Sequence, residues 1–201
     1  MSRLFDSMFS LCALALLCPL LALIAVAVVL VDGWPFWFLH ERVGKDGHPF
    51  LVIKFRTMTR LSGAERGRFD AGQGDRVTRL GRLLRASKLD ELPQFINVLK
   101  GDMAIVGPRP EVRKWVDTYP ERWAEVLAVR PGITDPASIV FRDEEKRLAE
   151  ESDPDRAYGE AILPEKLSLY REYALNRSFV KDLAIIGATV MAVLSRRGKT
   201  E

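Results

Sequence analysis

The chain begins with a long apolar segment and continues as alternating apolar and densely charged stretches. No charged side chain occurs from Ser7 to Val31. The run Met8–Val31 would form a helix of roughly 36 Å at about 1.5 Å per residue, enough for a hydrocarbon core of about 30 Å. The sequence therefore predicts a membrane-associated helix in residues 1–33 and a separate body in residues 34–201.

Three interpretations of the apolar segment compete. A signal peptide is disfavoured, because only Arg3 gives it a basic start and the apolar run continues past a cleavage-like site at Ala25–Ala27. A spanning helix and a re-entrant helix both remain open. Pro19 has no N–H to donate and favours a kink or break, yet proline also occurs in ordinary spans. In both cases, 29 of the 30 Lys and Arg residues follow the segment, which predicts a cytoplasmic body.

The patterning of the body predicts many helices and one small β-hairpin. Residues 36–41 and 50–53 read as two strands joined by a type I′ turn at Asp46–Gly47. The aromatic residues of 34–38 form either an interfacial belt or ordinary core packing. We further expect a surface loop over residues 61–75 and helices over residues 77–86, 91–99, 111–127, 164–176 and 180–194.

Two of these helices carry specific expectations. In 91–99, apolar residues fall at helical spacing, Asp90 is placed as the N-cap and Gly101 ends the helix. In 164–176, we expect Leu167, Tyr170 and Leu175 to be buried. The helix at 180–194 is too short to span a membrane, so we expect it either in the core or at the membrane interface. An apolar helix at this place is also compatible with a homodimer.

The amino-acid composition excludes several classes of protein and of metal site. The net charge of +3 excludes a protein that coats nucleic acid through bulk charge, and a 48% hydrophobic content excludes disorder. With two histidines and two cysteines, a His/Cys zinc site is excluded. Cys12 and Cys18 point to different faces of a helix, so we expect no disulfide between them.

The adjacent carboxylates Asp90 and Glu91 are the strongest candidates for chemistry. At a helix start, both would be favoured in their ionised form. An ionised Asp could act as a nucleophile, and the pair could bind Mg²⁺, which often takes one or two carboxylates plus substrate phosphates. The alternative is simple capping without catalysis.

Several cations occur on stiff turns around this pair. Arg109 is held in the loop formed by Gly107, Pro108 and Pro110, and Arg130 precedes a Pro-Gly turn. Arginines on rigid turns suit bidentate phosphate recognition. With the two acids, these cations suggest a diphosphate site, while the nucleotide-binding glycine motifs are absent from the sequence. The proposed phosphate-binding residues are Arg85, Arg109, Lys54 and Arg130.

Four motifs in this order are recognisable: KFRTM at Lys54–Met58, the LDELPQ block within Ser87–Met103, VGPRP at Val106–Pro110 and RPGIT at Arg130–Thr134. With them, nearly the whole chain resembles the bacterial sugar transferase family, the monotopic phosphoglycosyl transferases that act on polyprenyl phosphate. The resemblance implies a re-entrant helix broken near Pro19. The implied fold is mostly α with a small β-hairpin, in which a compact cytoplasmic α/β body carries interfacial amphipathic helices.

The resemblance also implies a reaction at the cytoplasmic face of the bacterial inner membrane, in contact with the lipid bilayer. A sugar-1-phosphate would pass from a UDP-sugar to undecaprenyl (polyprenyl) phosphate, releasing UMP, as the first membrane step of a glycoconjugate pathway. Asp90 would be the nucleophile that carries the covalent phosphosugar intermediate, and the reaction would use Mg²⁺. Glu91 would assist through the metal or the acceptor proton. Arg85 and Arg109 would hold phosphate oxygens, with Lys54 and Arg130 as weaker members of the site.

One segment departs from the family pattern. Residues Asp135–Glu145 replace the Gly and Gln-Val that commonly follow RPGIT, which places the sugar or nucleotide contacts there in doubt. We interpret Asp143, Glu144 and Glu145 as a solvated charge run. The competing function is a membrane-anchored lipid-binding or scaffold protein without turnover, in which the Asp-Glu pair and Arg109 would have no purpose.

Overall fold

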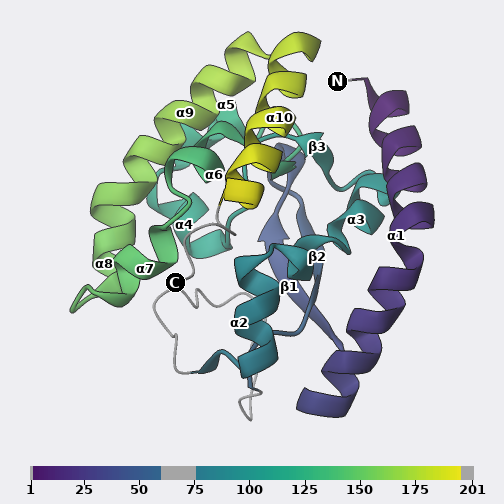
Figure 1. Ribbon diagram of the computed structural model, residues 1–201. Coiled ribbons are helices and arrows are strands. Elements are labelled where there is room, and N and C mark those ends of the chain that lie inside the picture. Colours follow the sequence, from purple (N-terminus) through teal and green to yellow (C-terminus); the bar gives the residue numbers. More distant parts are fainter. Residues whose placement is uncertain (1, 60–75, 196–201) are drawn as a thin grey trace.

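The computed structural model describes residues 2–59 and 76–195, so the loop predicted over 61–75 lies outside the described residues (Figure 1). Short turns of 3₁₀ helix at Lys45–Gly47 and Leu89–Glu91, and of π-helix at Tyr158–Ile162, connect the main elements. In chain order the helices and strands are α1 (Arg3–Asp32), β1 (Trp37–Val43), β2 (Pro49–Phe55), α2 (Arg79–Ala86), α3 (Gln94–Lys100), β3 (Ala104–Val106), α4 (Arg113–Thr118), α5 (Pro120–Val126), β4 (Gly132–Thr134), α6 (Pro136–Val140), α7 (Glu144–Ala149), α8 (Pro154–Ala157), α9 (Leu163–Asn176) and α10 (Phe179–Ser195).

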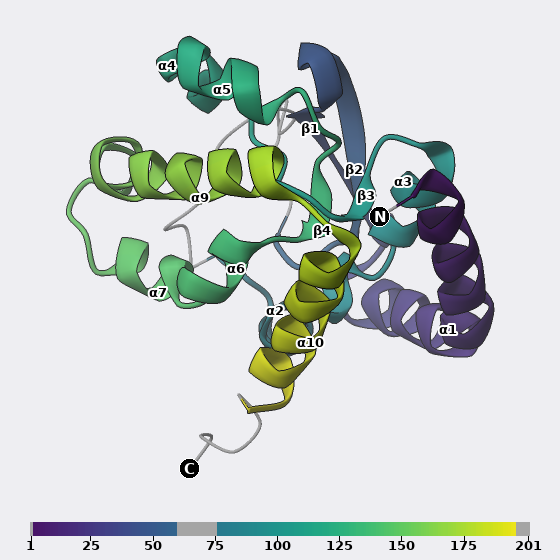
Figure 2. The same ribbon diagram turned by 90° about the horizontal axis from the view of Figure 1, so that it is seen from above.

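The apolar segment forms one helix, α1, which is long and apolar enough to cross a bilayer. The break predicted near Pro19 is not found, because helical structure continues through the proline. The helix axis instead bends in its middle part (Figures 1 and 2). A proline removes one hydrogen bond of a helix, and a bend can absorb the clash of its ring. As expected, Cys12 and Cys18 are free thiols.

Both halves of α1 contact the body. Near its start, the Arg3 guanidinium donates hydrogen bonds to the carbonyls of Val98 and Leu99, the latter at 2.7 Å, at the end of α3. Farther along, Ile24 and Val28 pack in a cluster with side chains of β2 and α2. Much of the remaining surface of α1 is exposed leucine and valine.

The predicted hairpin is confirmed, with longer strands than expected. β1 and β2 pair antiparallel from Trp37–Phe55 to Val43–Pro49. Asp46 and Gly47 both have positive φ, as a type I′ turn requires. Trp34 is exposed beside α1, whereas Trp37 stacks on Phe55 with ring centroids 5.3 Å apart. The aromatic cluster thus divides between surface and core.

The hairpin lies between α1 and α3 on one side and the bundle of α4 to α9 on the other (Figures 1 and 2). The bundle core contains Trp115, Trp123, Leu167 and Tyr170 among others. Leu167 and Tyr170 are therefore buried as predicted, but Leu175 is exposed, because it lies on the outer face of α9. Pro120 divides the helix expected over 111–127 into α4 and α5.

The loop before Arg109 is fixed by a short parallel sheet of β3 and β4. The Gly107 N–H donates to the Thr134 carbonyl at 3.0 Å, and the Gly132 N–H donates to the Pro108 carbonyl at 3.0 Å. A Cβ atom on Gly132 would lie 2.1 Å from the Gly107 nitrogen. Only two glycines allow these backbones to approach so closely, and this contact positions the predicted loop.

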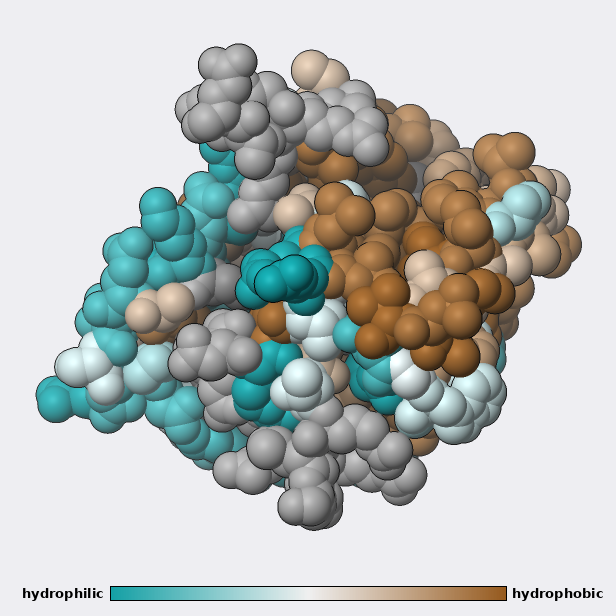
Figure 3. Space-filling model, turned by 60° about the horizontal axis from the view of Figure 1, so that its bottom comes forward, coloured by the Kyte–Doolittle hydropathy of each residue, from teal (hydrophilic) through white to brown (hydrophobic). Residues whose placement is uncertain are grey.

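Hydrophobic residues gather on the side of the molecule where α1 lies, and hydrophilic residues cover the opposite side, where α7 and α8 lie (Figure 3). The last helix, α10, packs against α6, β3 and β4 and leaves Phe179, Val180 and Met191 exposed. A helix with one apolar exposed face suits the membrane interface.

Through Gly81, helix α2 rests directly on the backbone of Thr57, just beyond the end of β2. A Cβ atom there would lie 2.1 Å from the Thr57 carbonyl oxygen and within 3 Å of two further backbone atoms. We expect Gly81→Ala to lower the free energy of unfolding by about 1–3 kcal/mol, although alanine is the better helix former. Thermal or denaturant unfolding measures this change.

Gly187→Ala is the matched control, because it changes the same residue type inside helix α10, where a Cβ atom would meet nothing within 4 Å. This variant should be as stable as the parent or more stable by up to about 1 kcal/mol. Equal stability of the two variants would refute the close packing of α2 on Thr57.

Candidate active site

Five of the predicted site residues line one pocket of about 180 Å³. Its walls come from the β1–β2 hairpin, the end of α2, the turn before α3 and the loop after β3. The structure thus brings together Lys54, Arg85, Asp90, Glu91 and Arg109. Arg130 does not join them, because its Nε donates to the Gly101 carbonyl at 3.0 Å and its side chain lines a different pocket.

The two acids do not begin a helix, so the prediction that Asp90 is an N-cap is wrong. Leu89–Glu91 forms a 3₁₀ turn after Lys88, which has a φ of 59°, and α3 starts only at Gln94. Pro93 has no N–H to donate to the Leu89 carbonyl, so regular helical hydrogen bonding can begin only after it. The turn directs both carboxylates into the body, where each is buried.

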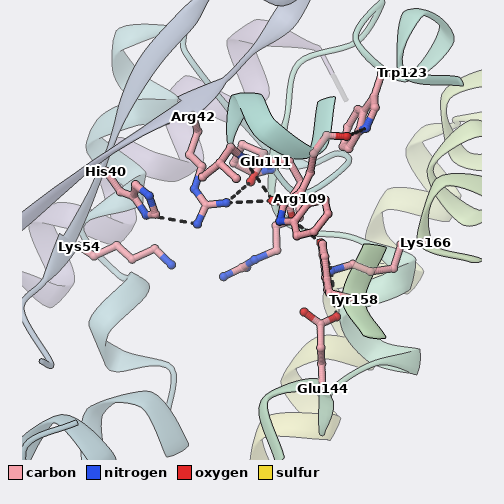
Figure 4. A network of polar contacts seen from close by, with 12 residues as sticks. His40, Arg42, Lys54, Arg109, Glu111, Trp123, Glu144, Tyr158 and Lys166 are labelled. Atoms are coloured by element: carbon pink, nitrogen blue, oxygen red, sulfur yellow. Dashed lines mark hydrogen bonds and ion pairs between the residues drawn. The ribbon is translucent and has the colours of Figure 1, made fainter. Parts of the chain in front are cut away.

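Glu91 is held by two cations. The Lys54 ammonium donates to Oε1 at 2.9 Å, and the Arg109 guanidinium bonds both carboxylate oxygens, at 3.2 Å for Oε2. In Figure 4, Lys54 and Arg109 point toward one another from opposite walls. Burial alone would raise the pKa of Glu91, but the attraction of Arg109 and Lys54 holds it well below its ordinary value. Glu91 is therefore a fixed anion.

Asp90 has the opposite environment. Its side chain is 6% exposed, and Oδ1 has no hydrogen-bond partner among the described residues. Burial, and then the negative charge of Glu91, raise the pKa of Asp90, while Lys54, Lys88 and Arg85 oppose that shift. A poorly solvated carboxylate beside cations is suited to attack an electrophile or to bind a cation.

A second polar network, centred on Glu111, borders the same pocket (Figure 4). Arg42 donates to Glu111 Oε2 at 3.1 Å, and the Tyr158 hydroxyl donates to Oε1. The Lys166 ammonium bonds the Tyr158 oxygen at 3.2 Å and Glu144 Oε2 at 2.9 Å. Burial, and then the charge of Glu111, raise the pKa of Tyr158 well above its ordinary value, so the phenol keeps its proton.

Sequence patterning missed most of this network, because its members come from β1, the loop after Arg109, the π-helical turn and α9. The sequence did hold one indication of this network. Lys166 lies on the same face of its helix as Tyr170 and Tyr173, and both tyrosines are buried. The interpretation of residues 143–145 as a solvated run is wrong for Glu144, which pairs with buried Lys166. Asp135 is also buried and accepts from the Ser138 N–H as the N-cap of α6.

The fit of a metal ion can be judged from the carboxylates. Among the described residues, no group of three or more His, Cys, Asp or Glu side chains is arranged to hold a metal. Asp90 Oδ1 is available as a ligand, whereas both oxygens of Glu91 already accept hydrogen bonds from cations. The site therefore fits Mg²⁺ held by Asp90 together with ligand phosphates, and it does not fit a two-carboxylate cage.

Replacing Asp90 or Glu91 by its neutral amide should change the free energy of unfolding in opposite directions. Ionised Asp90 costs stability, because its pKa is raised in the folded state. That cost is absent below its ordinary pKa of 3.8 and complete above the raised pKa. We expect Asp90→Asn to stabilise the protein at pH 7 by roughly 0.5–2 kcal/mol, a gain typical of relieving a strained functional residue. The gain should vanish on acidification in denaturant unfolding.

Glu91→Gln is the contrasting variant. The pKa of Glu91 is lowered, so its contribution is present above the ordinary value of 4.5 and is lost as pH falls through the lowered pKa. Breaking the pair with Lys54 and Arg109 should cost about 3–5 kcal/mol at pH 7. Effects of equal sign for the two variants would contradict the assigned environments.

Comparisons with known proteins identify the family of this chain. Residues 1–196 match the family model described as bacterial sugar transferase. The chain is 43% identical to a UDP-glucose:undecaprenyl-phosphate glucose-1-phosphate transferase of Caulobacter vibrioides, over 96% of this chain and 69% of that protein. It is 36% identical to a UDP-N-acetylgalactosamine-undecaprenyl-phosphate N-acetylgalactosaminephosphotransferase of Aeromonas hydrophila, over 96% of this chain and 43% of that protein.

A third relative, the uncharacterized sugar transferase EpsL of Bacillus subtilis, is 37% identical over 98% of this chain and 89% of its own length. The match thus covers the apolar helix, the Asp90–Glu91 turn and the Arg109 loop together, and it agrees with the resemblance that the four motifs indicated. The chain belongs to the bacterial sugar transferase family.

Proposed function

We propose that this protein transfers a sugar-1-phosphate from a UDP-sugar to undecaprenyl phosphate and releases UMP. The observation that carries the proposal is Asp90, a buried carboxylate in a pocket rich in cations, with one oxygen that has no partner among residues 2–59 and 76–195. The relatives from Caulobacter and Aeromonas are named for transfers of this kind. Phosphoryl transfer depends mainly on positioning and charge stabilisation, and this pocket offers both.

The transfer proceeds in two displacements. One oxygen of the Asp90 carboxylate forms a bond to the phosphorus that bears the sugar, and the bond from that phosphorus to the bridging oxygen breaks, so UMP leaves with the bridging oxygen. An oxygen of the acceptor phosphate then attacks the same phosphorus and frees the Asp90 carboxylate. The product is a polyprenyl diphosphate sugar, and the two inversions give net retention at phosphorus.

The surrounding residues stabilise charge. Arg85 lies at the end of α2 on the wall beside Asp90 and can bind phosphate oxygens. Glu91 fixes Lys54 and Arg109 at the pocket, and its lowered pKa suits this positioning role better than acceptance of a proton. Mg²⁺, held by Asp90 and the donor phosphates, would neutralise phosphate charge.

Asp90→Asn should lower UMP release from a UDP-sugar in the presence of undecaprenyl phosphate by at least roughly 10³-fold, because the amide cannot form the acyl phosphate. Asp117→Asn, on the exposed side of α4, is the matched control and should retain activity. Without acceptor, the parent should release UMP once per active site and carry a phosphosugar adduct on Asp90, seen by mass spectrometry. UMP release that strictly requires acceptor would exclude the covalent route.

We further propose that α1 enters the membrane from the cytoplasmic face and returns to it. Its two halves are fastened to one body, through Arg3 on α3 and through Ile24 and Val28 on β2 and α2. A helix that crossed the whole bilayer would have to release one of these contacts. The exposed leucines of its middle part would then face lipid.

This topology predicts that the start of α1 is cytoplasmic. With Cys12 and Cys18 changed to Ala, a single cysteine at Ser2 should be protected from an impermeant maleimide added to intact cells, and labelled after lysis. A cysteine at exposed Glu121 reports the side on which the body lies. Labelling of the Ser2 position alone in intact cells would show a spanning helix.

A further inference from the structure

A second pocket adjoins the one that holds Asp90. It has a volume of about 360 Å³ and lies between α2, α6 and α7. Arg85, Lys88, Arg109, Glu144 and Lys166 line both pockets, so they form the boundary between the two. A ligand in the second pocket can therefore reach Asp90 across Arg85 and Lys88.

The second pocket is strongly basic. Among the residues that the structure describes, seven cationic side chains line it against two carboxylates, Asp143 and Glu144. Glu144 pairs with Lys166, and Asp143 lies 3.4 Å from the Arg142 guanidinium. Because this excess of positive charge surrounds a cavity within the usual size range of ligand sites, the pocket suits a ligand with several negative charges.

Apolar lining is also present. Val77 and the buried Phe141 contribute to the walls between the cations. A planar ring can pack on such surfaces while attached phosphates meet Arg and Lys. The combination of a basic boundary and an apolar wall matches a nucleotide better than a simple inorganic anion.

The position of the pocket separates it from the lipid acceptor. Helix α7, which supplies part of its wall, lies on the hydrophilic side of the molecule (Figure 3). The Asp90 pocket is lined by Phe55, whose ring packs with Ile24 and Val28 of the membrane helix. A polyprenyl phosphate anchored in the bilayer therefore reaches the Asp90 pocket first, and a water-soluble donor reaches the second pocket first.

We propose that the pocket between α2, α6 and α7 binds the nucleoside monophosphate part of the donor, with the diphosphate crossing Arg85 and Lys88 toward Asp90. This inference rests on the proposed function. The segment that departs from the family pattern, Asp135–Glu145, then forms a wall of the donor site. Glu144 occupies Lys166 until the donor phosphate replaces its carboxylate.

The test uses the full chain in nanodiscs and UMP as the probe. Arg142 and Lys146 are exposed side chains of the pocket wall, so the double variant Arg142→Met/Lys146→Met should fold normally. We expect its Kd for UMP, measured by calorimetry, to rise roughly tenfold or more, from the loss of charge-assisted contacts. The KM for the UDP-sugar should rise in parallel, while the KM for undecaprenyl phosphate stays within about twofold.

Arg147→Met is the matched control, because Arg147 is an exposed cation of the same helix that does not line the pocket. It should bind UMP like the parent. Unchanged UMP affinity in the double variant, or an equal loss in the control, would overturn the assignment. UMP binding that depends on Arg142 and Lys146 without turnover of any UDP-sugar would support the nucleotide pocket and refute the proposed transferase reaction.

Discussion

The ion pairs of Glu91 with Arg109 and Lys54 are the interaction on which the arrangement of the site depends. They join three parts of the chain: the turn before α3, the loop after β3 and strand β2. Glu91 is buried, and its charge would be very costly there without the two cations. The pairs therefore fix the walls of the pocket before any substrate arrives.

The environment of the Asp90 carboxylate follows from the same ion pairs. Glu91 accepts the hydrogen bonds of Arg109 and Lys54, so Oδ1 of Asp90 is left buried with no partner in the part of the chain that the structure describes. The ionised carboxylate of Asp90 therefore lowers the stability of the folded protein, whereas the ionised carboxylate of Glu91 raises it. Such strain is consistent with the proposed role of Asp90, because the energy of desolvation is recovered when a ligand binds.

The long apolar helix α1 supports the pocket from outside. Ile24 and Val28 pack in one cluster with Phe55, a residue of the pocket wall, and α2 rests on the backbone of Thr57 through Gly81. One side of the pocket is therefore built against α1, whereas the basic side is built on α6 and α7. Under the proposed function, the lipid acceptor and the water-soluble donor approach Asp90 from these two sides.

The long apolar helix, the hairpin, most helix positions and the set of acids and cations could be predicted from the sequence, because periodicity, turn residues and motif spacing are local properties. Three features emerged only from the folded chain: α1 continues through Pro19, Arg130 lies apart from the site, and Glu111, Tyr158 and Lys166 form a buried network. It also showed that only Glu91 has a lowered pKa, although both acids were expected to favour their ionised forms at a helix start. Burial and charge pairing arise from segments distant in the chain, and no local pattern encodes them.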